Sequence, residues 1–452
     1  MPAALDQVFK AYDVRGVYPD QLDEELAERV GRAFVALTGA ATLAIGQDMR
    51  PSSKPMADAL AAGAMAQGAD VLRVGLCSTD MLYYVSGALD VAGVMLTASH
   101  NPARYNGLKL CRPGAVPVGE ESGLADLKRM VAAGEPAADA GRRGQERQAD
   151  DLLERYAAHV RGFAELASLR PLKVVADAGN GMAGHVVPAV FAGLPFELVA
   201  MYFELDGSFP NHPADPLNPE NLRELQARVV AEGADVGLAF DGDADRVFLV
   251  DELGATVPSS LVGALVARLM CEREPGATVL YNLICSRVVP ETIREAGGVP
   301  VRTRVGHSFI KGVMAETGAI FGCEHSGHYY FRDNYRADSG LIAALVTLDA
   351  LSRAGRPLSE VLAPYRRYAA SGEVNRRVDG DPGTRIDEVA ARYPADASDF
   401  VDGLTVDGGD WWFNLRPSNT EPLLRLNVEA ATGAEMARVR DEVLAAVGGE
   451  PA

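Results

Sequence analysis

The chain has 452 residues, 48% of them hydrophobic and 23% charged, and its formal net charge at pH 7 is −19. That acidity excludes nucleic-acid binding as a main function, which needs a basic surface, and the length predicts three or four domains. Residues 1–10 show no signal peptide, no apolar run reaches the roughly 18–20 residues of a membrane helix, and the five scattered cysteines lack CxxC spacing, so we expect a cytoplasmic protein without a membrane partner.

The first third of the chain alternates short apolar runs with alanine-rich helical stretches, which predicts α/β structure around a largely parallel sheet. The segment 141–150 is rich in Gly, Arg and Asp and is predicted to be a linker or an exposed loop. We therefore expect a first domain at 1–147. The runs and helical stretches on which this rests are 43–46, 71–75, 93–96, 22–38 and 54–67.

The same alternation returns twice, at 148–253 and at 254–368, and predicts two further α/β domains. The third of these includes an apolar helix, LIAALVTLDALSRAG, that ends at a glycine cap. The last stretch, 369–452, differs because two alternating strands flank a polar loop, and a helix follows. It predicts an antiparallel α+β domain, so the expected fold class is three α/β domains followed by one α+β domain.

An acidic loop follows the apolar strand ADVGLAF in the second domain. Asp241, Asp243 and Asp245 alternate with small residues, and Arg246 follows. Three such carboxylates repel one another unless a cation lies between them, and Mg²⁺ is the oxygen-preferring candidate. An EF-hand is excluded because Arg246 occupies the position that requires glycine. The alternative is a surface turn, but a loop at the end of a buried strand is where ligands of open α/β sheets bind.

A second loop, TASHNP, follows the apolar run that ends at Leu96. Ser99 in this loop does not fit the Gly-x-Ser-x-Gly pattern of a hydrolase nucleophile, and a helix cap or a turn with a structural His100 is the alternative. A phosphoserine beside the acidic loop would account for both loops, since its oxygens would complete the magnesium ligands. His100 and Lys109 lie close enough in sequence to handle its charge and protons.

Two further loops carry side chains suited to sugar hydroxyls and to phosphate. Glu324, Ser326 and His328 alternate along what we expect to be extended chain, so they would point the same way, toward vicinal sugar hydroxyls. The alternative is a strand end with a structural histidine. The other loop begins at Arg416 and is typical of a phosphate-binding nest, although polar turns with proline are common; its other donors are Ser418, Asn419 and Thr420.

Together these loops resemble the α-D-phosphohexomutase family, in its phosphomannomutase/phosphoglucomutase branch. The resemblance covers nearly the whole chain, and its specificity comes from the order and spacing of the motifs rather than from any one of them. Two motifs that are weak alone join it, FKAYDVRG near the start and RVGHS in the third domain. The matching segments are 10–16, 97–102, 241–246, 306–307, 324–328 and 416–422.

The resemblance implies a heart-shaped protein of four domains around a central cleft. It also implies an isomerase that moves phosphate reversibly between C1 and C6 of mannose or glucose phosphate, with Mg²⁺, a phosphoserine and a hexose 1,6-bisphosphate as intermediate and activator. Ser99 would carry the phosphoryl group and join Asp241, Asp243 and Asp245 as a metal ligand. The other implied roles are transfer, for Arg15, His100, Lys109, Arg246 and His328, and substrate binding, for Tyr12, His307, Glu324, Ser326, His328, Arg416, Ser418, Asn419 and Thr420.

Two positions depart from the family pattern. Cys323 stands where a glycine commonly precedes Glu324, and Ile284 stands where members that accept both sugars often have lysine. The missing lysine removes one expected cation and bears on whether both sugars are accepted. A phosphoglucosamine mutase, a serine-dependent metallophosphatase and an inactive sugar-phosphate sensor are also kept as alternatives. The expected partner is a small sugar phosphate, and the expected state is a monomer or weak dimer.

Overall fold

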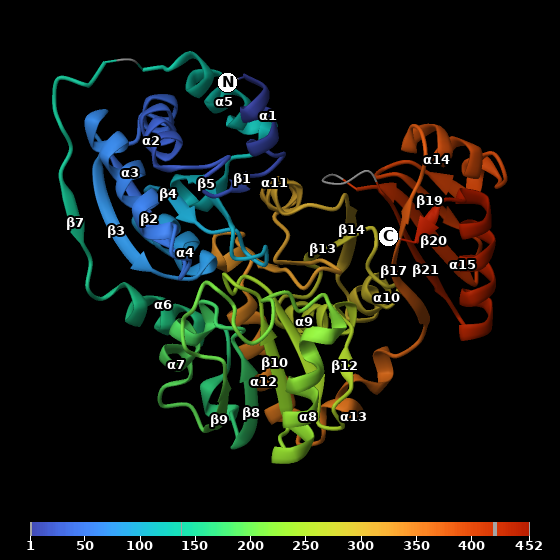
Figure 1. The fold of residues 1–452 in the computed structure, drawn as a ribbon. Coiled ribbons are helices and arrows are strands. Elements are labelled where there is room, and N and C mark those ends of the chain that lie inside the picture. Colours follow the sequence, from blue (N-terminus) through green and yellow to red (C-terminus); the bar gives the residue numbers. More distant parts are fainter. Residues whose placement is uncertain (1, 137, 419–422, 452) are drawn as a thin grey trace. The chain divides into compact units, whose positions relative to one another are not determined.

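The computed structural model describes residues 2–136, 138–418 and 423–451, with the main chain only for 2–4, 307 and 308 (Figure 1). The chain forms two compact units. The first unit comprises Met1–Ser259 with Ser326–Val361, and the second comprises Ser260–His325 with Leu362–Ala452. Among the described helices, none combines the length and the apolar character that crossing a membrane requires.

The first sheet of the first unit runs in the order β1-β5-β4-β2-β3-β7, with β6 beside β5. Its centre is parallel, because β2 pairs in parallel with both β3 and β4, whereas β5 is antiparallel to β4 and β1. The elements are α1 (Pro2–Val8), β1 (Val14–Val17), α2 (Glu24–Thr38), β2 (Thr42–Gln47), α3 (Ser53–Ala66), β3 (Asp70–Leu76), α4 (Thr79–Leu89), β4 (Ala92–Leu96), β5 (Tyr105–Arg112), β6 (Val116–Pro117), α5 (Leu124–Ala133) and β7 (Glu146–Gln148).

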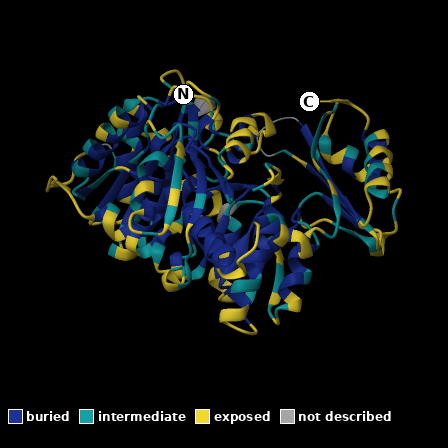
Figure 2. Cartoon of the chain, turned by 90° about the horizontal axis from the view of Figure 1, so that it is seen from below, coloured by how far each residue is buried: buried dark blue, intermediate teal, exposed yellow. Residues whose placement is uncertain are grey.

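Alternation along the strands gives this sheet two apolar faces. Ile45 of β2 and Val94 of β4 belong to a core cluster with residues of α2, α3 and α5. Met95, the residue after Val94, instead contacts Cys77 just before α4. Successive side chains of a strand point to opposite faces, so helices cover the sheet on both sides (Figure 1). Figure 2 shows the result as buried strands beneath helices whose outer faces are exposed.

The segment 141–150 is not only a linker. Residues Glu146–Gln148 form β7, which pairs in parallel with β3 at the edge of the first sheet. All three residues of β7 are exposed, so the segment has no apolar alternation from which a strand could be predicted. The main-chain pairing alone makes it an edge strand.

The second sheet of the first unit runs in the order β12-β11-β10-β8-β9. β8 is parallel to β9 and β10, and β11 is antiparallel to β10. Every residue of β10 is buried, as expected of a central strand covered on both faces. The elements of this part are α6 (Leu152–Arg161), β8 (Leu172–Asp177), α7 (Ala183–Phe191), β9 (Phe196–Met201), α8 (Arg223–Glu232), β10 (Val236–Phe240), β11 (Val247–Asp251), β12 (Thr256–Val257), β16 (Tyr329–Phe331), α12 (Gly340–Ala354) and α13 (Leu358–Leu362).

The second unit contains a parallel sheet and an antiparallel one. In the parallel sheet β13 lies between β14 and β15, and the antiparallel sheet has the order β18-β19-β20-β21-β17-β22. The hairpin predicted at the end of the chain is confirmed as β20 and β21. The elements are α9 (Ser259–Arg273), β13 (Thr278–Asn282), α10 (Val288–Glu295), β14 (Val299–Thr303), α11 (His307–Thr317), β15 (Phe321–Cys323), β17 (Ala369–Arg377), α14 (Pro382–Ala390), β18 (Ser398–Asp399), β19 (Leu404–Asp407), β20 (Trp411–Pro417), β21 (Leu423–Ala430), α15 (Gly433–Val447) and β22 (Glu450–Pro451).

Arg287, at the start of α10, ties the two sheets of the second unit together. Its main-chain N–H donates to Glu429 of β21 at 2.9 Å. Its guanidinium donates to the Asp407 carboxylate at 2.6 Å and to the Trp411 carbonyl at 3.1 Å. Glu429 is 3% exposed and also accepts from the Trp412 indole at 2.9 Å, so two N–H donors satisfy its buried carboxylate.

Candidate active site

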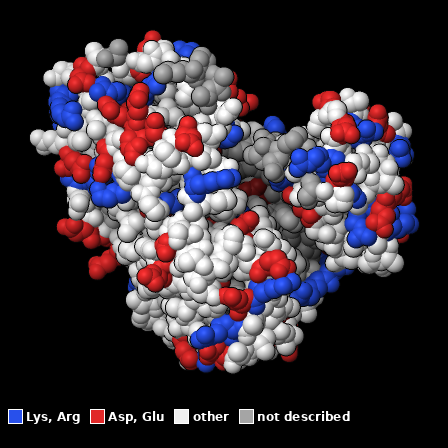
Figure 3. All heavy atoms as spheres, viewed as in Figure 1, with Lys and Arg blue, Asp and Glu red and all other residues white. Residues whose placement is uncertain are grey.

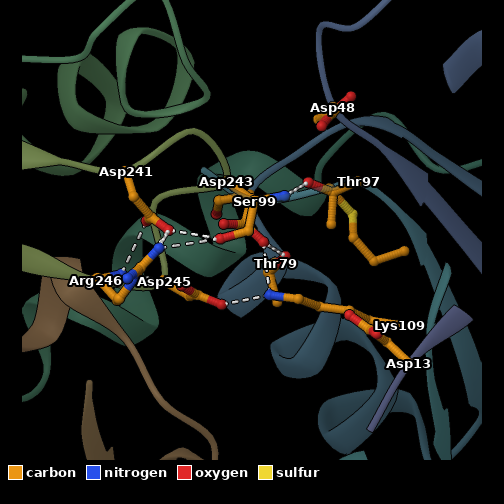
Figure 4. Close-up of polar contacts among 12 residues, drawn as sticks. Asp13, Asp48, Thr79, Thr97, Ser99, Lys109, Asp241, Asp243, Asp245 and Arg246 are labelled. Carbon is orange, nitrogen blue, oxygen red and sulfur yellow. Dashed lines mark hydrogen bonds and ion pairs between the residues drawn. The ribbon is translucent and has the colours of Figure 1, made fainter. Parts of the chain in front are cut away.

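The Ser99 loop and the acidic loop meet at the carboxyl ends of two parallel-sheet strands. Ser99 follows β4, and Asp241 follows β10 directly (Figure 4). A Cβ atom on Gly242 would collide with the carbonyl oxygen of Ser99, so the close approach of the loops requires glycine at that position. The Thr79 N–H donates to the carbonyl of Asp243 at 3.0 Å and adds the start of α4 to the same site.

Ser99 is buried and in contact with the acidic loop. Its Oγ donates to Oδ2 of Asp241 at 2.8 Å and lies 3.1 Å from Nδ1 of His100. Its main-chain N–H donates to Oγ1 of Thr97 at 2.9 Å. The backbone of Ser99 has a φ of 51°, a left-handed conformation that few residues other than glycine adopt. The serine hydroxyl is thus fixed against a carboxylate rather than placed as a helix cap.

The three aspartates of the acidic loop form one buried cluster with two cations. One carboxylate oxygen from each lies within 4.8 Å of the others. Lys109 donates to Oδ2 of Asp243 at 2.7 Å and to Oδ2 of Asp245 at 2.6 Å. Arg246 donates from Nε to Oδ2 of Asp241 at 2.9 Å. The two cations neutralise part of the charge, and the cluster retains a negative excess that favours a further cation.

The charges of the cluster shift the pKa values of its members. Burial raises the pKa of Asp241 well above the usual value, and Arg246 offsets only part of this. For Asp243, burial opposes ionisation, but Lys109 outweighs it and the pKa lies below the usual range. Burial likewise lowers the pKa of Lys109, yet Asp243 and Asp245 more than compensate and hold it raised. Lys109 is therefore held as the ammonium cation.

The cluster fits a divalent cation. Among the described residues, Oδ1 of Asp243 and Oδ1 of Asp245 are buried and have no hydrogen-bond partner. A buried carboxylate oxygen without a donor is costly, and a hard cation satisfies such oxygens directly. The donor set is oxygen only, which suits magnesium better than softer transition metals.

Arg246, His100 and Arg15 surround the Ser99 hydroxyl. The guanidinium of Arg246 donates to Nδ1 of His100, so this ring nitrogen is an acceptor and the imidazole is neutral. Burial, and then the charge of Arg246, lowers the pKa of His100 in the same sense. Arg15, in β1, donates to Oδ1 of Asn101 at 2.6 Å and to Asp13 at 2.5 Å. Tyr12 lies in the bend before β1 and is half-buried.

His328 belongs to the same unit and reaches the acidic cluster. Its Nδ1 is 2.8 Å from Oγ of Ser326, and its Nε2 lies 3.7 Å from Oδ1 of Asp245 and 3.9 Å from Oδ2 of Asp338. An isolated main-chain bridge pairs His328 with Arg246. Ser326 thus contacts the histidine, and the ring lies between that hydroxyl and two carboxylates.

The expected extended chain from Glu324 to His328 is wrong. β15 ends at Cys323, β16 begins at Tyr329, and residues 325–327 form a turn in which Gly327 has a φ of 84°. Glu324 lies in the second unit, where it is 2% exposed and accepts from Asn282 at 3.1 Å and from the Gly306 N–H at 3.2 Å. The strand alternation that would align these side chains is therefore absent.

Arg416 lies at the end of β20 in the second unit. It is 5% exposed and donates to Oε2 of Glu373 at 2.9 Å, and its Nε has no hydrogen-bond partner among the described residues. Burial lowers its pKa, and Glu373 acts in the opposite sense. Ser418 Oγ accepts from Arg425 at 3.1 Å. Two of the predicted phosphate ligands, Asn419 and Thr420, lie outside the described residues, and His307 begins α11 with a side chain that is also outside them.

Sequence reasoning missed several groups that build the site. Thr79 donates from Oγ1 to Asp243 at 2.6 Å. Asp80 accepts from Tyr156 and Ser339, each at 2.5 Å, and the side chain of Arg50 reaches the Ser99 loop. The available signals were weak: a Ser-Thr-Asp helix start at Ser78 and polar residues in the turn after β2.

Comparisons with known proteins place matches along most of the chain. Family models described as phosphoglucomutase/phosphomannomutase match four successive stretches: alpha/beta/alpha domain I at 6–135, domain II at 154–254, domain III at 258–368 and the C-terminal domain at 373–446. The boundaries we expected at 147, 253 and 368 are not tested by the division of the structure into two units.

Individual relatives match over almost the whole chain. A protein of Xanthomonas campestris pv. campestris described as phosphohexose mutases is 40% identical over 439 residues, covering 96% of this chain and 97% of its own length. An Escherichia coli phosphomannomutase is 39% identical over 449 residues, covering 97% and 98%.

A solved structure gives the same result. The crystal structure of a phosphoglucomutase/phosphomannomutase family protein from Burkholderia thailandensis has a TM-score of 0.88 at 34% identity, covering 98% of this chain and 99% of that one. The resemblance drawn from the motifs is confirmed by all three comparisons. The chain belongs to the phosphoglucomutase/phosphomannomutase family.

Proposed function

We propose that this protein is a phosphohexomutase, an isomerase that moves a phosphoryl group between C1 and C6 of mannose phosphate or glucose phosphate. The observation that carries this proposal is the position of Ser99, whose Oγ is 2.8 Å from Asp241 within a buried acidic cluster. The relatives named phosphohexose mutases and phosphomannomutase support the substrate class.

In the proposed reaction phosphorylated Ser99 is the donor. The bond from Ser99 Oγ to phosphorus breaks as a bond forms from a sugar hydroxyl oxygen to the same phosphorus, and the product is a hexose 1,6-bisphosphate. The bisphosphate turns end for end, and Ser99 Oγ then takes the other phosphoryl group. The same bisphosphate, added in trace, would restore Ser99 that has lost its phosphoryl group.

The residues around Ser99 have distinct roles in this proposal. Asp241, Asp243 and Asp245 would hold Mg²⁺ together with a phosphoryl oxygen on Ser99. Bound there, the ion would supply positive charge that stabilises the transferring phosphoryl group. Arg246 is within 3.4 Å of Ser99 Oγ and would add a second positive charge.

The attacking hydroxyl must lose a proton, and the geometry favours His328 as the group that accepts it. Lys109 is engaged as a cation by two carboxylates. Nδ1 of His100 already accepts from Arg246. His328 has its Nδ1 on Ser326, which orients the ring and leaves Nε2 on the side of the acidic cluster.

Further residues are proposed to bind the rest of the substrate. Glu324 would bind sugar hydroxyls. The phosphate that is not reacting would be held by Arg416, Ser418, Asn419 and Thr420. The other proposed substrate contacts are Tyr12, Arg15, Ser326 and His307.

The proposal is tested by ³¹P NMR of the purified protein with Mg²⁺ and a trace of hexose 1,6-bisphosphate. Mannose 1-phosphate and glucose 1-phosphate are offered separately, and a Ser99→Ala variant is run in parallel. Conversion to the 6-phosphate in the native protein and its loss in the variant are expected. Free phosphate as product would indicate a metallophosphatase instead.

If neither sugar phosphate is converted, glucosamine 1-phosphate is the next substrate, and no turnover of any of the three would leave a binding protein. We also propose that the protein acts in the cytoplasm. The five cysteines support this, since all five are buried free thiols, as in proteins of reducing compartments.

A further inference from the structure

Arg50 is an enclosed cation beside the Ser99 loop that none of the proposed roles uses. It lies in the turn between β2 and α3, and its side chain is 0% exposed. An arginine is expensive to bury unless its charge is balanced and its N–H groups have acceptors. The hydrogen-bond acceptors around Arg50 therefore indicate its structural role.

Four of its acceptors are main-chain carbonyls of the Ser99 loop. Nη2 donates to the carbonyl oxygens of Ser99 at 2.9 Å and Asn101 at 2.6 Å. Nη1 donates to those of Pro102 at 2.9 Å and Tyr105 at 3.0 Å. One planar group thus binds the whole turn from the phosphoryl-carrying residue to the start of β5.

The fifth N–H and the charge are satisfied by Asp48. Nε donates to Oδ2 of Asp48 at 3.1 Å, and the carboxylate is fixed in turn by Oγ of Ser53 at 2.5 Å. The ring of Phe209 lies 5.0 Å from the guanidinium carbon and closes the other side. A guanidinium has five N–H groups, and each has a separate acceptor here.

These hydrogen bonds constrain a loop whose backbone conformation is unfavourable. Ser99 has a φ of 51°, and strained backbone of this kind, which costs on the order of 1–3 kcal/mol, persists only where surrounding contacts enforce it. The hydrogen bond from Arg50 to the Ser99 carbonyl acts on that residue directly. The Oγ of Ser99 consequently lies 2.8 Å from Oδ2 of Asp241.

We infer that Arg50 is the positioning residue of Ser99, fixing the main chain of 99–105 so that the hydroxyl meets the acidic cluster. Arg50 touches neither the reacting oxygen nor the cluster, so it acts through the loop. The expected effect of Arg50 on turnover rests on the proposed function. The constraint that Arg50 places on the loop does not depend on any activity.

The test compares Arg50→Lys with the native protein. Lysine keeps the charge but has a single ammonium in place of the fork, so it can bind only part of the carbonyl set. Hydrogen exchange followed by mass spectrometry should show faster exchange in 98–106 and unchanged exchange in α2 and α3. Because a displacement of 1 Å at a reacting group costs about 100-fold, kcat should fall by roughly that factor while KM stays within about twofold.

Arg161→Lys is the matched control. Arg161 also donates to main-chain carbonyls, those of Val190 at 3.0 Å and Ala189 at 2.7 Å, but it lies on α6, outside the site. It should leave kcat and the exchange of 98–106 unchanged. Native exchange in 98–106 of Arg50→Lys, or a kcat equal to that of the native protein, overturns the inference.

If Arg50→Lys does not fold, a second variant, Asp48→Asn, tests the positioning role of Arg50. Asp48→Asn keeps the shape but removes the charge that aligns Nε of Arg50, and should change exchange and kcat in the same direction by a smaller factor. Native exchange and native kcat in Asp48→Asn would then overturn the inference. If the native protein converts no sugar phosphate, the proposed function fails, and the exchange measurement alone decides the role of Arg50.

Discussion

The hydroxyl of Ser99 donates a hydrogen bond to Oδ2 of Asp241 over 2.8 Å, although 142 positions separate the two residues in sequence. Phosphorylation of Ser99 removes the hydrogen of this bond and brings a phosphoryl group of about −2 charge to the same carboxylate. Two anions in such a buried position repel each other unless a cation lies between them. The phosphorylated and unphosphorylated proteins should therefore differ in how strongly they depend on magnesium.

We predict that adding Mg²⁺ raises the melting temperature of the phosphorylated protein more than that of the Ser99→Ala variant. A ligand that binds the folded state stabilises it by an amount set by its affinity, and the phosphoryl oxygens increase that affinity. The measurement is calorimetry of both proteins with EDTA and with Mg²⁺. Equal magnesium shifts in the two would contradict a metal site shared with Ser99.

Lys109→Met should destabilise the metal-free protein strongly. Lys109 neutralises Asp243 and Asp245 in a buried position, and removing one partner of a buried ion pair costs about 3–5 kcal/mol. Mg²⁺ should recover part of that loss, because it replaces the missing charge. Urea unfolding with and without Mg²⁺ measures both effects. Lys128→Met, which breaks an exposed pair with Asp6, is the control and should cost less than about 1 kcal/mol.

Asp80 should give the protein a specific pH dependence. Burial raises its pKa from 3.8 to about 6, although hydroxyls of Ser339, Ser78 and Tyr156 lower it in part. The folded state therefore binds the Asp80 proton more tightly than the unfolded chain between these two values. This contribution stabilises the fold at low pH and is lost as pH rises through about 6.

The size of that contribution is on the order of 3 kcal/mol, at 1.36 kcal/mol for each unit of pKa. Other carboxylates titrate in the same range, so the measurement is the difference between the native protein and Asp80→Asn in free energy of unfolding from pH 4 to pH 7. The difference should change by that order across the interval. Asp126→Asn, at an exposed position of α5, should show no such change.

Arg416→Lys should raise KM for the sugar phosphate by about tenfold with a smaller effect on kcat. Arginine donates a planar pair of N–H groups that matches a phosphate, and lysine does not. A lost hydrogen bond to a charged group is worth about 1.5–3 kcal/mol, and the phosphate that we propose for this loop is not the one that reacts. Steady-state kinetics give both constants. Arg438→Lys, in an exposed network on α15, is the control, and an equal KM increase there would contradict the assignment.

Much of the candidate site could be predicted because its loops follow apolar strands. Asp241 comes directly after a run of buried residues, and the carboxyl ends of such strands are where ligands bind in open α/β sheets. Arg50 could not be found in this way. The main-chain carbonyls that it binds begin 49 positions away at Ser99, and a single arginine in a polar turn has no pattern of its own.

Two local errors have a physical reason as well. The alternation of polar residues from Glu324 to His328 predicts extended chain, although Gly327 is a signal for a left-handed turn. The segment 141–150 is predicted to be a linker or an exposed loop, because an exposed edge strand such as β7 buries neither face and needs no apolar alternation. In both places main-chain conformation, rather than side-chain pattern, decided the structure.

Glu324 and Arg416 belong to the same compact unit, and Arg287 ties the sheets that carry them. The carboxylate proposed to read sugar hydroxyls and the guanidinium proposed to hold phosphate are therefore parts of one body. Contacts within one unit, those of Arg287 among them, constrain the spacing between the two side chains. We therefore expect the second unit to select substrates by length: a hexose with one phosphate would contact both side chains, and a phosphorylated disaccharide would bind more weakly.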